Sequence, residues 1–115
     1  MDSPSRRRSW VCLGLGSNLG DKQRNLELAL TWLKEEVTFD RVSSFYETDP
    51  VGFEDQPAFV NAAASGSTDL SPDRLLTFIK GVERDAGRVP TVVNGPRVLD
   101  IDILLFGVGT PPSGA

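Results

Sequence analysis

The segment that most constrains the fold spans residues 94–107, where a strand-like apolar run carries two carboxylates and follows an arginine. Residues 98–106 are rich in Val, Ile and Leu, which predicts a β-strand that is buried on both faces. Asp100 and Asp102 interrupt this run two positions apart, so on a strand both side chains leave the same face. Their Cβ atoms would then lie roughly 6–7 Å apart.

The chemistry of this segment favours a metal and a phosphate. Two carboxylates at this spacing repel each other and lose hydration between apolar neighbours, unless a cation lies between them. Oxygen ligands of this kind favour Mg²⁺, above all where a substrate phosphate completes the coordination shell. Arg97 precedes the pair behind a Gly-Pro turn, and its guanidinium suits phosphate oxygens. The segment therefore indicates phosphoryl transfer, although a strand end whose acids face water remains the alternative.

The composition excludes several other classes of site. The 115 residues include no His and a single cysteine, Cys12, which rules out His-ligated zinc, Ser-His-Asp catalysis and an internal disulfide framework. The net charge of −4 argues against a nucleic-acid binder with a broad basic surface. No apolar run approaches the ~20 residues that cross a bilayer. We expect a cytoplasmic protein that acts on small molecules and binds neither nucleic acid nor membrane.

The length predicts one domain with one modest core. We place this domain at residues 10–107. Residues 1–9 are expected to form a disordered tail. Residues 108–115, which are rich in Gly and Pro, are expected to form a second one.

Periodicity predicts the remaining elements. Strands are expected at residues 10–15, 37–48 and 58–65. Helical spacing gives two apolar faces, one made by Leu26, Ala29, Leu30, Leu33 and Val37 and the other by Leu75, Ile79, Val82 and Ala86. Together with the strand at 98–106, the order is strand, helix, strand, strand, helix, strand. This order predicts an α+β fold, the ferredoxin-like βαββαβ sandwich, with an antiparallel sheet and both helices on one face.

Three polar or glycine-rich features each have an ordinary structural explanation. The pattern Gly14-x-Gly16-x-x-x-Gly20 resembles a phosphate loop, but its spacing matches neither known type, and a plain turn explains it as well. Asn61 either bonds across the sheet to backbone or reads the edge of a heterocycle. Glu83 adjoins the buried face of the second helix, where a salt-bridged acid is the commoner explanation.

Four blocks of sequence carry a family resemblance: L-G-L-G-S-N-L-G-D, S-S-F-Y-E-T-D-P-V-G, D-Q-P-A-F-V-N-A-A and G-P-R-V-L-D-I-D-I-L-L-F-G. In this order they make residues 11–107 resemble the hydroxymethyl-dihydropterin pyrophosphokinases of folate biosynthesis. The resemblance implies a transferase that moves pyrophosphate from ATP to 6-hydroxymethyl-7,8-dihydropterin and releases AMP, with Mg²⁺ as cofactor.

The resemblance also implies roles for individual residues at the nucleotide. Asp100 and Asp102 would hold two Mg²⁺ ions that bridge ATP, and Arg88 and Arg97 would clamp phosphate oxygens. These four residues form the expected catalytic set. Those that would contact the nucleotide are Arg88, Arg97, Glu83 and Ile103.

On the pterin side, the resemblance implies that Thr48, the backbone of Val51 and the amide of Asn61 read the edge of the ring. Phe59 would pack near its face.

The chain also departs from the family pattern. The family continues past this point with a segment that supplies further basic contacts and the second wall of the pterin slot. Residues 89–94 contain no Arg or Lys, although the family places a basic residue where Val93 stands. The alternative is therefore a truncated, non-catalytic ferredoxin-like binding module or a fragment of such an enzyme. An uncovered sheet would also permit self-association.

Overall fold

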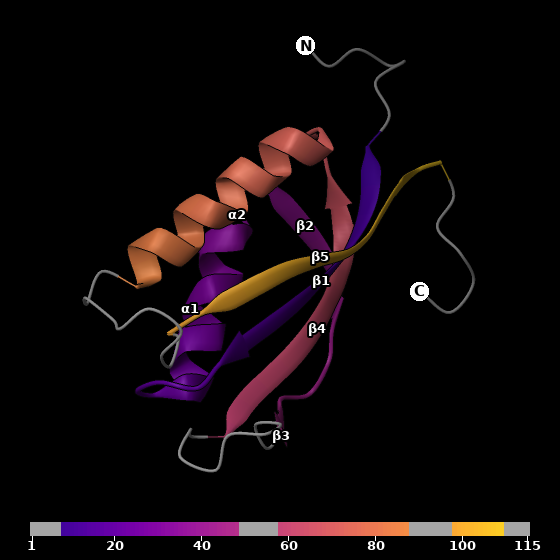
Figure 1. Ribbon diagram of the computed structural model, residues 1–115. Helices are drawn as coiled ribbons and strands as arrows, with labels where there is room; N and C mark the ends of the chain where they lie inside the picture. Colours follow the sequence, from indigo (N-terminus) through magenta and orange to yellow (C-terminus); the bar gives the residue numbers. More distant parts are fainter. Residues whose placement is uncertain (1–7, 49–57, 88–97, 110–115) are drawn as a thin grey trace.

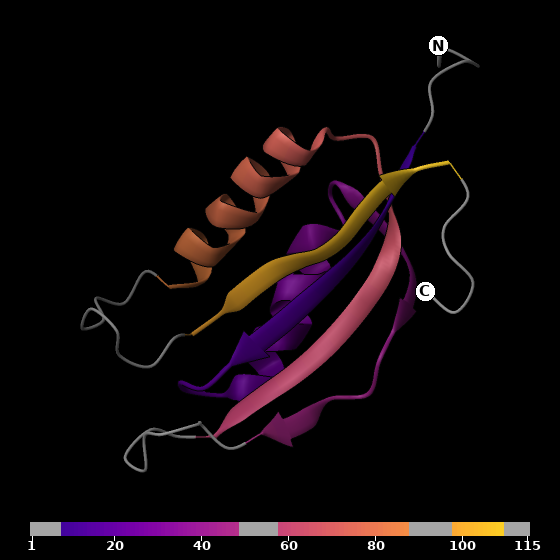
Figure 2. The same cartoon turned by 45° about the vertical axis from the view of Figure 1, so that its right-hand side comes forward.

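Two helices cover one face of a five-stranded antiparallel sheet, and no helix of the described residues covers the other face (Figure 1). The structure is a computed structural model that describes residues 8–48, 58–87 and 98–109. Figure 2, turned by 45°, shows α1 and α2 on the same side of the strands. The ferredoxin-like α+β fold predicted from the sequence is confirmed.

The elements follow the predicted order, with one strand divided. They are β1 (Ser9–Ser17), α1 (Lys22–Leu33), β2 (Val37–Val42), β3 (Tyr46–Thr48), β4 (Phe59–Thr68), α2 (Pro72–Ala86) and β5 (Asp100–Val108). The sheet order is β2-β4-β1-β5, and β3 also pairs with β4. None of the described helices is long and apolar enough to span a membrane.

The helices begin where their capping residues lie. The side chain of Asp21 accepts a hydrogen bond from the backbone N–H of Arg24, and Ser71 does the same for Arg74 at the start of α2. Pro72 occupies the first turn of α2, where its missing N–H costs nothing. The two caps therefore fix where α1 and α2 begin.

The first helix is shorter than its apolar pattern suggests. It ends at Leu33, and Val37, predicted to be on its apolar face, instead begins β2. Val37 is nevertheless buried in the same core, with 1% of its surface exposed. Val37 matched the helical spacing because β2 returns the chain to the same core shortly after the helix ends.

The core lies between the helices and the inward side of the sheet. Alternate residues of β1, which are Val11, Leu13 and Leu15, point into it. The side chains that are fully buried there from the helices are Leu26, Ala29, Leu33, Leu75 and Ile79. This one-sided burial leaves Gly14 and Gly16 on the opposite face of β1, where the candidate site lies.

The strand predicted to be buried on both faces is an edge strand, so that prediction was wrong. β5 pairs only with β1, and Leu104 and Leu105 are 54% and 49% exposed. Leu104 is the extra residue of a β-bulge, because Ile103 pairs with Leu13 while Leu105 pairs with Cys12. The high apolar content of this strand reflects one buried face together with exposed leucines beyond the bulge.

The second predicted strand is divided by a break at residues 43–45. There the backbone N–H of Ser43 donates to the carbonyl of Ala63, and Ser43 Oγ accepts from the N–H of Ala63. The serine side chain thus replaces part of the ladder. The break places β3 against the end of β4 that carries Asn61.

Candidate functional site

A shallow depression of about 230 Å³ crosses the open face of the sheet from β3 to β5. The residues around it come from four strands: Gly14, Leu15, Gly16, Tyr46, Phe59, Asn61, Ala62, Ala63, Asp100, Asp102 and Leu104. Segments far apart in the sequence therefore meet at one place, and both predicted metal ligands are among them.

The two aspartates leave the same face of β5, as their spacing predicts. Asp100 pairs with Gly16 and Asp102 with Gly14, so each aspartate has beside it on β1 a residue without a side chain. Asp100 is half-buried and Asp102 is exposed. Such a pair combines a partly desolvated carboxylate with one that faces water.

The paired glycines are part of the floor of the depression. A Cβ at Gly16 would lie 3.1 Å from Asn61 Oδ1, and one at Gly14 would lie 3.3 Å from Leu104 Cδ1. Both glycines lie inside β1 and not in a loop or turn, and a phosphate-binding role for them stays a prediction. Gly20 alone lies in the turn before α1, with a φ of 73°.

Asn61 is held by a side chain rather than by backbone. Its Nδ2 donates to Thr48 Oγ1 at 2.8 Å, across the pairing of β3 with β4. This bond satisfies one donor and fixes the plane of the amide, whose Oδ1 lies over Gly16. Thr48 pairs with Phe59 in the same ladder. Three of the four residues predicted for the pterin, namely Thr48, Phe59 and Asn61, are therefore adjacent.

Glu83 connects α2 to the strand that carries the aspartates. Its Oε2 accepts a hydrogen bond of 2.7 Å from the backbone N–H of Ile101, and its Oε1 lies 3.2 Å from Lys80 Nζ. The side chain is only 15% exposed. Ile101 is the residue between Asp100 and Asp102, so Glu83 holds the backbone from which both carboxylates project.

Ile103 lies on the other side of β5. It pairs with Leu13 and packs against the core under the helices, so its side chain is outside the depression. Arg88, Arg97 and Val51 lie outside the residues that the structure describes.

Sequence reasoning missed Tyr46 and Leu104 as lining residues. Tyr46 lies two residues before Thr48 on β3, so both side chains leave the same face, and the prediction for Thr48 implied one for Tyr46. Leu104 lies two residues after Asp102, so the same alternation along β5 could have found it as well.

The donor set of the depression fits Mg²⁺. The described residues include no group of three or more His, Cys, Asp or Glu side chains that could hold a metal. Two carboxylates with access to water are nevertheless what Mg²⁺ uses when substrate phosphates supply further oxygens. Asp100 and Asp102 would hold the ion, which would neutralise phosphate charge.

The match to known sequences covers almost the whole chain. Residues 12–114 match the pattern of 7,8-dihydro-6-hydroxymethylpterin-pyrophosphokinases. The chain belongs to this pyrophosphokinase family. The resemblance stated from the four blocks is thus confirmed, and the fold and the shared face of the aspartates belong to a pyrophosphokinase domain.

Individual relatives agree with this membership. The chain is 47% identical over 96 residues to the 2-amino-4-hydroxy-6-hydroxymethyldihydropteridine pyrophosphokinase of Bacillus subtilis, covering 82% of this chain and 58% of that protein. It is 43% identical over 96 residues to the enzyme of the same name from Aquifex aeolicus, covering 84% and 60%. It is 46% identical over 96 residues to the folic acid synthesis protein FOL1 of Dictyostelium discoideum, covering 84% and 15%. The chain therefore spans about three-fifths or less of the length of these relatives.

Proposed function

We propose that this pyrophosphokinase domain acts in the Mg²⁺-dependent transfer of pyrophosphate from ATP to 6-hydroxymethyl-7,8-dihydropterin, with release of AMP. The observation that carries the proposal is the meeting of Asp100 and Asp102 with the oriented amide of Asn61 in one depression. Carboxylates for a metal on one side and an amide for a heterocycle on the other match the two substrates of this reaction.

The pterin would occupy the end of the depression formed by β3 and β4. Since Thr48 accepts from Asn61 Nδ2, the amide oxygen of Asn61 is presented as an acceptor for a ring N–H. Phe59 and Tyr46 provide aromatic surface beside it. The depression is smaller than the 300–1,000 Å³ typical of drug-sized ligands, so the described residues enclose only part of the substrate.

The nucleotide would lie toward β5. Mg²⁺ held by Asp100 and Asp102 would supply charge neutralisation for the phosphates and alignment for in-line attack. Ile103 would contact the nucleotide through its backbone, because its side chain packs against the core. The N–H of Ile101 donates to Glu83 of α2, which indicates that it points away from β1, and by alternation Ile103 would also direct its N–H and C=O to the outer edge of the sheet. Arg88 and Arg97 would bind phosphate oxygens, and Glu83 would lie beside the nucleotide.

In the reaction the hydroxymethyl oxygen of the pterin attacks the β-phosphorus of ATP. A new oxygen–phosphorus bond forms, the bond from the β-phosphorus to the oxygen that bridges it to the α-phosphorus breaks, and AMP leaves with that oxygen. The hydroxyl proton passes to a nearby carboxylate or to water. The rate would come mainly from placing the two substrates in line and from neutralising charge.

The test is to mix the protein with ATP, MgCl₂ and 6-hydroxymethyl-7,8-dihydropterin and to follow AMP by chromatography. AMP formation that requires both Mg²⁺ and the pterin supports the proposal. ATP or pterin binding without AMP would favour the alternative, a non-catalytic binding module. The absence of binding by either substrate, in a folded protein, would refute the assignment of the site.

We also propose that the chain self-associates through the outer edge of β5, the edge that does not pair with β1. Leu104, Leu105 and Val108 are exposed there by 49–62%, and the outer edge of β5 has no neighbouring strand among the described residues. Sedimentation velocity should show dimers that Leu105→Lys dissociates. A monomer at all concentrations would contradict this. The cytoplasmic location remains a proposal as well, which cell fractionation would test.

A further inference from the structure

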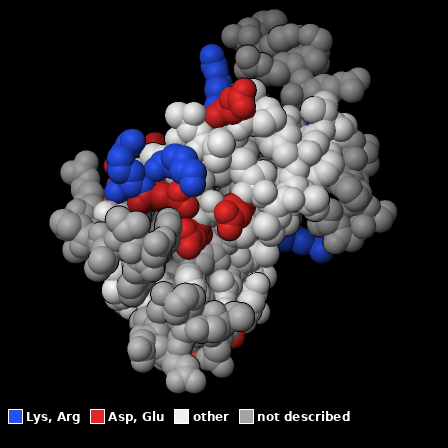
Figure 3. Space-filling view, viewed as in Figure 1, with Lys and Arg blue, Asp and Glu red and all other residues white. Residues whose placement is uncertain are grey.

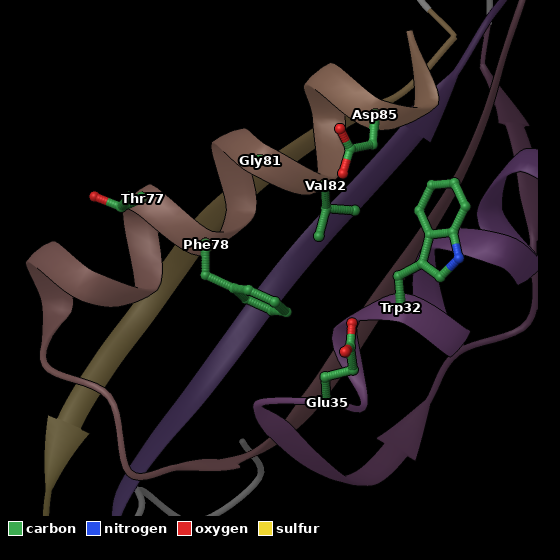
Figure 4. A pocket seen from close by; sticks show the side chains of 7 residues that line it. All are labelled: Trp32, Glu35, Thr77, Phe78, Gly81, Val82 and Asp85. Atoms are coloured by element: carbon green, nitrogen blue, oxygen red, sulfur yellow. The ribbon is translucent and has the colours of Figure 1, made fainter. Parts of the chain in front are cut away.

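A second depression lies in the helix layer, on the opposite side of the sheet from the candidate active site (Figure 4). It has a volume of about 330 Å³ between the end of α1 and the second half of α2. Its lining residues are Trp32, Glu35, Thr77, Phe78, Gly81, Val82 and Asp85. We call it the interhelical groove. No residue predicted to serve the pyrophosphokinase reaction lines it.

The walls of the groove combine aromatic rings with carboxylates. Figure 4 shows the rings of Trp32 and Phe78 on two sides and the carboxylates of Asp85 and Glu35 at the other two. Both rings are half-buried because their inner sides pack against the core. Among the described residues that line the groove there is no Lys or Arg. Aromatic faces flanked by two negative charges favour an organic cation, and a planar guanidinium most of all.

The second half of α2 carries acidic and basic side chains together, at Lys80, Glu83, Arg84 and Asp85. In the space-filling view, red and blue atoms gather over the C-terminal half of α2, whereas the described part to their right is mostly white (Figure 3). Asp85 itself lies 3.9 Å from Arg84 Nε, with the two side chains 54% and 78% exposed. A carboxylate has about four acceptor positions, so Asp85 can bind an incoming cation without losing the partners that it already has.

Gly81 supplies an independent observation about the groove. It lies in the interior of α2, where glycine costs roughly 1 kcal/mol relative to alanine. A Cβ at this position would meet only Arg84 Nη2, at an ordinary contact distance of 3.6 Å. Packing within the described chain therefore does not require the glycine. What the missing side chain does provide is free space in the groove.

We propose that the interhelical groove binds an arginine side chain of a partner polypeptide, with the guanidinium stacked on Trp32 between Glu35 and Asp85. The occupant is a polypeptide side chain and not a free amino acid, because the two carboxylates of the groove would repel an α-carboxylate. Family members such as the Dictyostelium protein contain this domain as about 15% of a longer chain, so faces of the domain can adjoin other polypeptide.

The two tryptophans of the chain make a direct test possible. Trp32 lines the groove, whereas Trp10 is on β1 and packs over Gly107 of the neighbouring β5. In a ¹⁵N-correlated NMR spectrum the indole N–H signals report the two sites separately. Titration with N-acetyl-arginine amide should shift the Trp32 signal and leave Trp10 unchanged. N-acetyl-citrulline amide, a neutral analogue, should bind at least about fivefold more weakly, a difference of about 1 kcal/mol.

Variants locate the binding. Gly81→Ala should raise the melting temperature and weaken arginine amide binding at least about fivefold, a combination that general unfolding cannot produce. Glu35→Gln should weaken it as well, whereas Glu27→Gln, an exposed acid of α1 outside the groove, should not. Equal binding of citrulline amide, undiminished binding by Gly81→Ala, or tighter binding of free arginine than of the amide would overturn the proposal.

Discussion

Replacing Glu83 by alanine should destabilise the domain and loosen the strand that carries the aspartates. The carboxylate accepts a 2.7 Å hydrogen bond from the N–H of Ile101, and that residue is 3% exposed. A hydrogen bond to a charged group contributes roughly 1.5–3 kcal/mol, and its loss leaves a buried N–H without this partner. The ion pair with Lys80, whose side chain is 65% exposed, adds at most about 0.5 kcal/mol. We therefore expect Glu83→Ala to cost about 2–3 kcal/mol.

The assay is urea unfolding of matched variants, combined with hydrogen exchange at the amide of Ile101. Glu83→Gln retains an acceptor without the charge and should cost about 1 kcal/mol, whereas Lys80→Ala should cost about 0.5 kcal/mol or less. Exchange at Ile101 should accelerate in Glu83→Ala beyond the change in global stability. A cost below about 0.5 kcal/mol for Glu83→Ala, with unchanged exchange at Ile101, would refute the reasoning.

Three further outcomes follow from the same geometry. Asp102→Ala should abolish Mg²⁺-dependent ATP binding in calorimetry without lowering stability, since the side chain is exposed; a variant whose ATP affinity still rises with Mg²⁺ as much as that of the unaltered protein would contradict the metal site. Asn61→Ala should weaken pterin binding by about 1–3 kcal/mol and leave ATP binding nearly unchanged, and parallel loss of both with a lower melting temperature would indicate a structural role instead. Leu13→Ala should cost about 2–5 kcal/mol in urea unfolding because its side chain is fully buried; a cost under 1 kcal/mol would show that the site collapses around the gap.

The sequence predicts the fold well where local chemistry and periodicity agree. Ser71 and Pro72 mark the start of α2, and its apolar spacing places Leu75 and Ile79 in the core. The prediction was less successful where tertiary context decides. An apolar strand is compatible with a central or an edge position, and only the pairing of β5 with β1 alone shows which one occurs.

The candidate site was predictable in part for the same reason. The two-residue spacing of Asp100 and Asp102 fixes their common face on any strand. The hydrogen bond between Asn61 and Thr48 depends on the break between β2 and β3. There the side chain of Ser43 accepts a bond that a backbone carbonyl would otherwise accept. The role of Glu83 depends on the approach of α2 to β5, and no local pattern encodes that contact.

The bulge at Leu104 divides β5 into two segments that pair with β1 in different registers. Ile103 and the aspartates keep one register with β1, and Leu105 to Val108 keep another. Deleting Leu104 would merge them into a regular ladder without reversing the face of any other residue. We therefore expect this position to tolerate the loss of one residue. Homologues could gain or lose a residue here during evolution while both the carboxylate pair and the distal pairing persist.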